Sequence, residues 1–497
     1  MVPDTVRHFV GGQHVHSTLR KSYGVTDPAT GKEYAQVEVG LGPDVNQAVL
    51  AARAALETGR WPEMTATDRA RVLSAIADAI DARVGDIAAA EALGPGLPVT
   101  PSGAQAARAG GVFRRAADLI TARAGTGEVD RGGPSGYLVR RPAGVAGLIT
   151  PWRSPFLAQA RAVAPALAAG CAIVLKPDEW APLPAALLAE ISIAAGLPDG
   201  VLNVVHGSLH HKAPGTQARD ALISHPQVTR LWFDGAADAG QQVALDAATH
   251  RTRLSAELAG TSPCLIFADA DLDRAADGAL FGAFARNGQR RTATSTILAE
   301  RPVYEAVVSR LAQRAERIRV GDPADQATEL GPLPHADHYD RLMAFVRLGV
   351  REGARLAAGG RRPAGLPDGN FLAPTVLADV DPALPGFTDP LGGPVVRVAP
   401  FDTAEEAVAL ANAVAGAVAN HPAAAYLWTA DLSRARRLAP DLTTASLWVN
   451  SSNPGDLPAA VPAERNGAAG QADLDFFTQP LTVRVAADET PAAPFGG

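Results

Sequence analysis

Side chains that could act as nucleophiles are few in this chain. Its two cysteines, Cys171 and Cys264, both stand in apolar runs. Thiols in such runs are core groups more often than reactive thiolates, and they imply no disulfide framework, which favours a reducing cytoplasm. The hydroxyl groups of Thr292, Thr294 and Ser295 have no histidine or lysine that we can assign to activate them. We therefore expect no conventional nucleophile.

Charged side chains offer a different kind of chemistry. Arg290 and Arg291 are adjacent and follow a Gly-Gln pair, and Arg153 follows a Pro-Trp pair. A guanidinium is a permanent cation with five N–H donors and no nucleophilic lone pair. Such groups can bind a carboxylate or a phosphate, and Glu257 could serve beside them as an acid or a base.

The hydrophobic pattern predicts the elements that must position these residues. Apolar residues recur at helical spacing over 45–58, 67–83 and 103–123, with Asp44 and Thr65 as expected N-caps of the first two helices. Residues 137–140 and 145–150 are expected to pair as two strands joined by a turn. Short apolar strands then alternate with helices in two successive runs, which is typical of parallel βαβ units. We expect two α/β lobes with a small-molecule site between them.

Several short motifs follow one another in a fixed order. They are LITPW at 148–152, APALAAGC at 164–171, LKPDE at 175–179, GLPDGVLNVV at 196–205, ELAGTSP at 257–263, VGDP at 320–323 and WVN at 448–450. In order and spacing the chain resembles the aldehyde dehydrogenase superfamily over roughly residues 9–485. The resemblance implies an α/β fold of three parts. These are a Rossmann-like cofactor domain (1–125 and 142–252, with 445–465), a catalytic-type domain (253–444) and a small β oligomerisation element (126–141 and 466–488).

In that family a thiolate attacks the aldehyde, a hydride passes to NAD or NADP, and a glutamate activates water. The resemblance places Arg291 at the position of the nucleophilic cysteine and Arg153 at that of the oxyanion amide. Glu257 falls at the position of the general base. We therefore predict that the thiolate route is unavailable, and that Glu257 forms an internal ion pair with Arg291.

The resemblance also implies positions that would contact a dinucleotide. These positions are Thr150, Pro151, Trp152, Lys176, Glu179, Gly235 and Gly240. The glycines would let the backbone approach a pyrophosphate, but Asp234 beside them would repel it. Pro390 and Gly392 stand where the family keeps a glutamate and a phenylalanine near the nicotinamide. Binding of NAD or NADP is therefore expected to be weakened or lost, and no metal is expected.

Three functions stay open at this point. The first is a scaffold or regulatory subunit without catalysis, in a homodimer, a homotetramer or a complex with an active paralogue. The second is an enzyme of different chemistry that acts on an anionic small molecule through Arg153, Arg291 and Glu257. The third is a residual NAD(P)-dependent oxidoreductase. The first is favoured, because the fold motifs persist while the nucleophile, oxyanion and nicotinamide positions change together.

The overall composition disfavours several classes of partner. The 497 residues are 47% hydrophobic and 20% charged, with a formal net charge of -7 and a pI of about 5.9. This acidic balance argues against nucleic acid or an anionic membrane surface. The longest apolar run, 162–175, is interrupted by Pro165 and is shorter than the roughly 20 residues of a membrane span. We expect no signal peptide and a cytoplasmic, globular protein.

Overall fold

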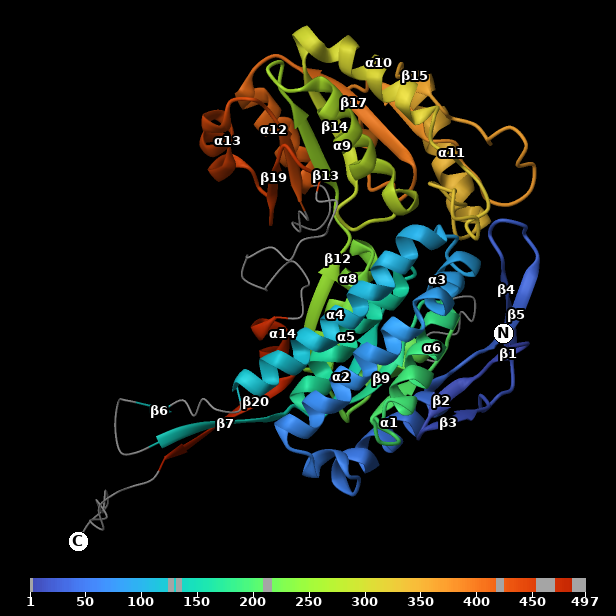
Figure 1. The fold of residues 1–497 in the computed structure, drawn as a ribbon, viewed down its shortest axis with the longest axis vertical. Coiled ribbons are helices and arrows are strands. Elements are labelled where there is room, and N and C mark those ends of the chain that lie inside the picture. The colour runs from blue at the N-terminus through green and yellow to red at the C-terminus, as the bar shows by residue number, and fades with distance from the viewer. Residues whose placement is uncertain are drawn as a thin grey trace.

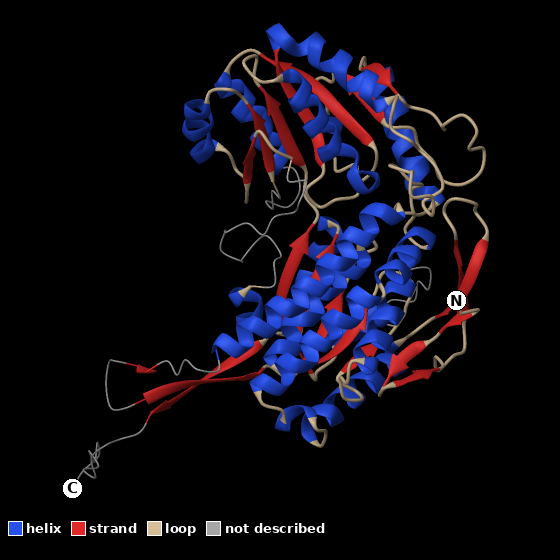
Figure 2. Ribbon diagram, in the orientation of Figure 1, coloured by secondary structure: helices blue, strands red, loops and turns tan. Residues whose placement is uncertain are grey.

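The computed structural model describes residues 3–123, 129–130, 136–208, 217–416, 424–452 and 470–484. These residues form two lobes, each built on a seven-stranded sheet with helices packed on it (Figures 1 and 2). A narrow arm of strands reaches away from one lobe (Figure 1). The α/β architecture predicted from the alternation of strands and helices is confirmed.

The first sheet belongs to the N-terminal half of the chain. Its order is β12 (Arg253–Leu258), β11 (Val228–Gly235), β8 (Val145–Ile149), β9 (Ala172–Lys176), β10 (Leu202–Val204), β2 (His8–Val10) and β3 (Gln13–Val15). The five strands from β12 to β10 are parallel, and β2 and β3 at the edge run antiparallel. Strands β8 and β9 are buried along their whole length, as expected of apolar strands covered on both faces.

Helices cover this sheet and match most of the predicted positions. They are α1 (Gly42–Glu57), α2 (Ala66–Ala82), α3 (Val84–Leu93), α4 (Val99–Arg123), α5 (Pro155–Ala169), α6 (Pro182–Ala194), α7 (Ala218–Ser224) and α8 (Ala237–Thr249). Thr65 caps α2 as predicted, because its hydroxyl accepts from Asp68 N at 3.1 Å. The prediction that Asp44 caps α1 is wrong. Asp44 lies inside the helix, and its carboxylate accepts from the N-cap residue Leu41 at 2.8 Å.

The second sheet belongs to the C-terminal half. Its order is β15 (Arg355–Ala358), β16 (Thr375–Ala378), β17 (Val395–Phe401), β14 (Thr294–Glu300), β13 (Ser262–Ile266), β18 (Ala425–Trp428) and β19 (Leu447–Val449). Strand β15 is antiparallel to β16, and the other pairs are parallel. The helices of this lobe are α9 (Leu272–Phe284), α10 (Tyr304–Ala315), α11 (Ala336–Arg351), α12 (Ala404–Gly416) and α13 (Leu432–Leu438).

Two strands lie on the other side of the expected domain boundaries. Strand β12, which begins at residue 253, pairs with β11 in the first sheet. Strand β19, within the 445–465 segment assigned to the cofactor domain, pairs with β18 in the second sheet. Both are edge strands, and each lies beside a point where the chain crosses from one lobe to the other. A boundary placed a few residues away therefore assigns the whole strand to the other lobe. Residues 453–465 of that segment and 466–469 of the predicted oligomerisation element lie outside the described residues.

Two smaller sheets complete the fold. One joins β1 (Thr5–Val6), β5 (Glu33–Glu38) and β4 (Ser22–Thr26). The arm joins β20 (Thr478–Arg484), β7 (Gly136–Pro142) and β6 (Val129–Asp130), and α14 (Gln471–Phe476) precedes it. The predicted pairing of 137–140 with 145–150 is wrong, because β7 pairs with β20 in the arm while the apolar β8 needs burial between β9 and β11. None of the helices in the described part of the chain is both long and apolar enough to cross a membrane.

Candidate active site

The carboxyl ends of parallel strands in the first sheet carry most of the predicted site residues. Thr150 follows β8 and Lys176 ends β9, and Thr150 N donates to Lys176 O at 3.2 Å. On the other side of β8, the register places Asp234 of β11 beside Glu257 of β12. Because these strands are parallel, one edge of the sheet gathers residues that are far apart in the sequence.

The loop between α9 and β14 brings Arg291 to this edge. It contains η2 (Ala285–Gly288), where Arg286, Asn287 and Gly288 have φ values of 55°, 60° and 67°. Left-handed backbone is costly for residues other than glycine and persists where surrounding contacts impose it. Three successive residues of this kind, two of them not glycine, indicate that the turn is held from outside.

The side chain of Asn287 fixes this turn through hydrogen bonds. Its Nδ2 donates to Gly96 O at 2.9 Å and to Pro332 O at 3.0 Å, and its Oδ1 accepts from Gly331 N at 2.8 Å. Gly96 follows α3 of the first lobe, whereas the other two partners precede α11 of the second lobe. A single buried amide therefore fixes the turn against both lobes. Sequence analysis did not identify Asn287, because its partners are set by tertiary contacts.

Glu257 lies between two arginines. Its Oε2 is 2.9 Å from Arg161 Nη2 and 3.2 Å from Arg291 Nη1. The predicted ion pair with Arg291 is therefore present, and Arg161 adds a second. Burial alone would raise the pKa of Glu257, but Arg291 and Arg161 outweigh burial and hold it below its ordinary value. The carboxylate is ionised at neutral pH.

Arg161 is a site residue that sequence analysis missed. It lies on α5, where nearly every other residue is buried and apolar. A lone cation in such a helix was the available signal, because a buried guanidinium needs an acidic partner. Its partner could not be named from the sequence, since α5 and β12 are distant along the chain.

Asp234 and Arg153 complete the charged cluster. Burial and the neighbouring Glu257 raise the pKa of Asp234, although the nearby arginines act in the opposite sense. Burial lowers the pKa of Arg153, while Asp234 and Asp178 act to raise it. The Arg153 guanidinium carbon lies 5.7 Å from the centroid of the Trp152 ring. Three guanidinium groups therefore face two carboxylates at this edge of the sheet.

Both cysteines belong to the core. Cys171 and Cys264 are fully buried, and Cys171 Sγ donates to Phe477 O at 3.2 Å. Burial raises the pKa of Cys171 to about 11 and that of Cys264 to about 12. Both thiols are therefore protonated at neutral pH, and neither contacts the charged cluster.

The strand ends also fit a dinucleotide. Thr150 Oγ1 is buried and has no hydrogen-bond partner among the described residues. Lys176 beside it is buried too, and burial lowers its pKa while Asp178 and Glu179 act to raise it. A buried hydroxyl without a partner beside a buried ammonium suits the hydroxyl and phosphate groups of NAD or NADP.

Gly235 and Gly240 have packing roles as well. A Cβ atom at Gly235 would come within 2.5 Å of the Phe233 ring, and one at Gly240 would come within 2.1 Å of Leu258 Cδ2. A side chain at Gly240 would therefore push α8 away from β12, and one at Gly235 would displace the Phe233 ring of its own strand.

The loop before β17 approaches the same strand ends from the second lobe. Gly392 has a φ of 63°, and its carbonyl accepts from His338 Nε2 at 2.8 Å. The His338 ring packs edge-on against Trp152, with 5.7 Å between the ring centroids. Because Trp152 follows Pro151 and Thr150 directly, this loop lies beside the proposed dinucleotide position.

Comparisons with known proteins agree along nearly the whole chain. Residues 14–470 match the model of the aldehyde dehydrogenase family. The chain is 38% identical over 458 residues to 5-carboxymethyl-2-hydroxymuconate semialdehyde dehydrogenase of Escherichia coli, covering 91% of this chain and 94% of the relative. It is 35% identical over 487 residues to 2-hydroxymuconic semialdehyde dehydrogenase of Pseudomonas sp. (strain CF600), covering 95% and 98%. The structure matches NAD-dependent aldehyde dehydrogenase from Sinorhizobium meliloti with a TM-score of 0.90 and 32% identity, over 98% and 96% of the two chains.

These relatives overturn the favoured prediction of a scaffold or regulatory subunit, and with it the alternative of unrelated chemistry on an anionic molecule. Proteins 38% and 35% identical over most of the chain are named as semialdehyde dehydrogenases. The prediction of weakened or lost dinucleotide binding also lacks support, since Thr150 and Lys176 fit such a group. Substitutions at Arg291, Arg153, Pro390 and Gly392 therefore do not outweigh a resemblance that spans nearly the whole chain.

Proposed function

The chain belongs to the aldehyde dehydrogenase family, and from that premise we propose that it oxidises an aldehyde to a carboxylate with NAD or NADP as the oxidant. The observation that carries this proposal is the buried, unpartnered Thr150 hydroxyl beside Lys176, on the same sheet edge as the charged cluster of Glu257. A semialdehyde, which bears a carboxylate of its own, is the substrate class we propose. Two relatives are named for such substrates, and three guanidinium groups surround the site.

We propose further that this member of the family works without a thiol. The support is that Arg291, which the resemblance puts at the position of the family's nucleophilic cysteine, pairs with Glu257, while Cys171 and Cys264 are core groups. Aldehydes form hydrates in water, and the carbon of a hydrate already carries the second oxygen of the acid. The hydrate RCH(OH)2 loses one hydride and two protons to give RCOO⁻, and the oxidised nicotinamide supplies the hydride acceptor when the dinucleotide is bound. This balance needs no covalent bond to the protein.

The charged cluster has the groups that this reaction needs. Glu257 accepts a hydroxyl proton of the hydrate, because Arg291 and Arg161 keep its carboxylate ionised. Arg153 and Arg291 donate hydrogen bonds to the two oxygens, which become negatively charged as their protons leave. Asp234, whose pKa burial raises, is the neighbouring carboxylate to which the proton can pass.

We also propose roles for the parts of the fold. The first lobe, including β12, holds the dinucleotide, and the second lobe covers the aldehyde. The arm of β6, β7 and β20 joins copies of the chain into a homodimer or homotetramer. Its support is its projection from the lobe (Figure 1) and the exposure of Tyr137 and Leu481, at 48% and 38%.

The test is the formation of reduced dinucleotide by the purified protein. We expect turnover with 2-hydroxymuconic semialdehyde and less with a neutral aldehyde of similar length, and binding of NAD or NADP measured separately by the fluorescence of Trp152. Glu257→Gln is the matched variant, which should bind the dinucleotide but turn over at least about a hundredfold more slowly. Wild-type protein that binds a dinucleotide yet reduces none of it with any aldehyde would rule out the proposed reaction.

A further inference from the structure

The segment from η4 (Pro385–Phe387) to the start of β17 is held through its backbone. Five carbonyl oxygens accept hydrogen bonds from three side chains: Gly386 and Asp389 from Arg397, Pro390 and Leu391 from Arg341, and Gly392 from His338. Carbonyl groups held in this way fix the path of a loop without regard to its side chains.

Arg397 differs from the other two because it also contacts the first residues of β14, the strand that follows the loop of Arg291. Its Nε donates to Ser295 O at 3.3 Å, and its Nη2 donates to Asp389 O at 2.8 Å. Ser295 lies at the start of β14, four residues after Arg291. Arg397 is fully buried, and burial lowers its pKa to about 9. One guanidinium therefore joins the segment before β17 to the start of β14, the strand that directly follows the loop of Arg291.

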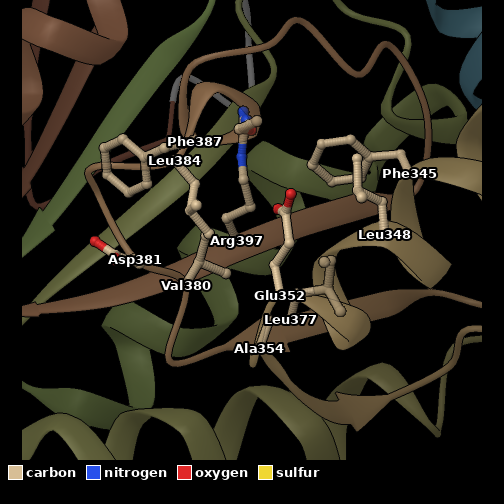
Figure 3. Close-up of a pocket in the computed structure, with 12 residues that line it drawn as sticks. Phe345, Leu348, Glu352, Ala354, Leu377, Val380, Asp381, Leu384, Phe387 and Arg397 are labelled. Atoms are coloured by element: carbon tan, nitrogen blue, oxygen red, sulfur yellow. The ribbon is translucent and has the colours of Figure 1, made fainter.

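The surroundings of Arg397 keep its guanidinium in place. Figure 3 shows the side chain rising from its strand between Phe345 and Phe387, across a pocket lined largely by apolar residues. The guanidinium carbon lies 5.7 Å from the centroid of the Phe345 ring. The aliphatic stem is thus packed as a core side chain would be, and the donor groups are aimed at carbonyls.

The turn before Arg291 and the loop before β17 also contact each other directly. A Cβ atom at Gly288 would lie 2.2 Å from Gly393 O, so the turn before Arg291 packs directly on the loop before β17. A shift of either loop would change the distance between Gly392 and the strand end at Trp152, which His338 now bridges.

We propose that Arg397 is a positioning residue, which sets residues 385–393 against the turn before Arg291 and so sets how closely this loop approaches the dinucleotide-binding strand ends. It touches no reacting atom. The inference concerns this loop alone, and only its kinetic readout rests on the proposed function.

The experiment compares Arg397→Met with Arg362→Met. Methionine keeps most of the stem but removes every donor, whereas Arg362 clasps carbonyls of a different loop, at Asp368 and Gly369. In Arg397→Met we expect hydrogen exchange over 386–393 to accelerate about tenfold. We also expect the KM for the dinucleotide to rise about tenfold, with a smaller change in kcat. Arg362→Met should leave both quantities unchanged.

Arg397→Lys is the second variant for this test, and it is measured if Arg397→Met does not fold. It keeps the charge and the stem, but one ammonium cannot reproduce the planar fork that reaches three carbonyls, so the loop should again exchange faster. Unchanged exchange over 386–393 in a folded Arg397 variant would overturn the inference. If wild-type protein shows no turnover, the proposed reaction fails, while the exchange result still decides the role of Arg397.

Discussion

Arg291 Nη1 lies 3.2 Å from Glu257 Oε2, in an ion pair that joins the loop before β14 to the end of β12. The pair connects the second lobe to the first at the candidate site. Arg161 Nη2 contacts the same oxygen at 2.9 Å from a helix of the first lobe. One carboxylate therefore pairs with two largely buried cations. Removing the carboxylate leaves both arginines without this partner, whereas removing one arginine leaves the other ion pair in place.

Glu257→Gln removes the charge that both arginines share. Leaving buried charge without a partner costs about 3–5 kcal/mol, so we expect a loss of this order in the free energy of unfolding in urea. Turnover should fall by at least about a hundredfold, because proton transfer to a placed base contributes at least that much. Arg291→Met is the comparison, and it should destabilise less, since the Arg161 pair persists. Equal turnover in Glu257→Gln and wild-type protein would exclude Glu257 as the base.

Arg291→Met should move the pH dependence of activity. Arg291 and Arg161 hold the pKa of Glu257 below its ordinary value against the effect of burial. The stabilisation from this carboxylate is present above its unfolded pKa and is lost as pH falls through the lowered folded pKa. Removing one cation raises that pKa, so the acidic limb of kcat/KM should shift to higher pH. An unshifted limb would mean that Glu257 is not the group that titrates.

Glu91 predicts a pH dependence of stability in the opposite direction. Burial raises its pKa from 4.5 to about 7, although Phe156 N donates to its carboxylate at 3.1 Å. The folded state thus binds the proton more tightly, and this contribution is present below the unfolded pKa and is lost as pH rises through the folded pKa. The free energy of unfolding of Glu91→Gln, taken relative to that of wild type, should therefore rise by about 3 kcal/mol from pH ~4 to pH ~8. This corresponds to roughly 1.4 kcal/mol for each pKa unit.

The control for Glu91 is an exposed acid on the same helix. Asp86→Asn should shift the free energy of unfolding by less than about 1 kcal/mol, with little change across the same pH range. Urea denaturation at a series of pH values measures both variants against wild type. A difference that stays flat with pH for Glu91→Gln would show that folding does not raise the pKa of Glu91.

The fold was largely predictable because its signals are local. Strands β8 and β9 are continuous apolar runs, and α2 has an amphipathic pattern with a capping residue at Thr65. Strand pairing was less predictable, because the turn before β8 looks like a hairpin turn whether or not the strands on either side pair. The chain leaves the arm at that turn and enters the core.

The site was predictable only where the family resemblance aligned both partners. Arg291 and Glu257 were expected to pair, and they do. Arg161, Asn287 and His338 were missed, because their roles depend on contacts between segments that no local pattern connects. The functional prediction failed for a different reason, since changes at a few positions inferred from a resemblance do not exclude the reaction of the family.

A reaction without a thiol makes a direct prediction about Cys171 and Cys264. The double variant Cys171→Ala and Cys264→Ala should form reduced dinucleotide with a kcat/KM within about threefold of wild type, since neither thiol is placed to act as a nucleophile. Iodoacetamide should label neither thiol quickly in the folded protein, because burial raises the pKa of both. Loss of turnover on alkylation of one thiol in folded protein would contradict the proposed route.

Gly288→Ala tests whether the turn before Arg291 is held as tightly as its contacts indicate. Gly288 has a φ of 67°, and a Cβ atom there would lie 2.2 Å from Gly393 O, so both the backbone conformation and the space exclude a side chain. We expect a loss of about 1–3 kcal/mol in the free energy of unfolding and a displaced Arg291. Gly111→Ala, in α4 with nothing within 4 Å of the added atom, is the matched control and should be neutral or stabilising by up to about 1 kcal/mol. If the two variants unfold at the same urea concentration, the turn is free to move and cannot hold Arg291 against Glu257.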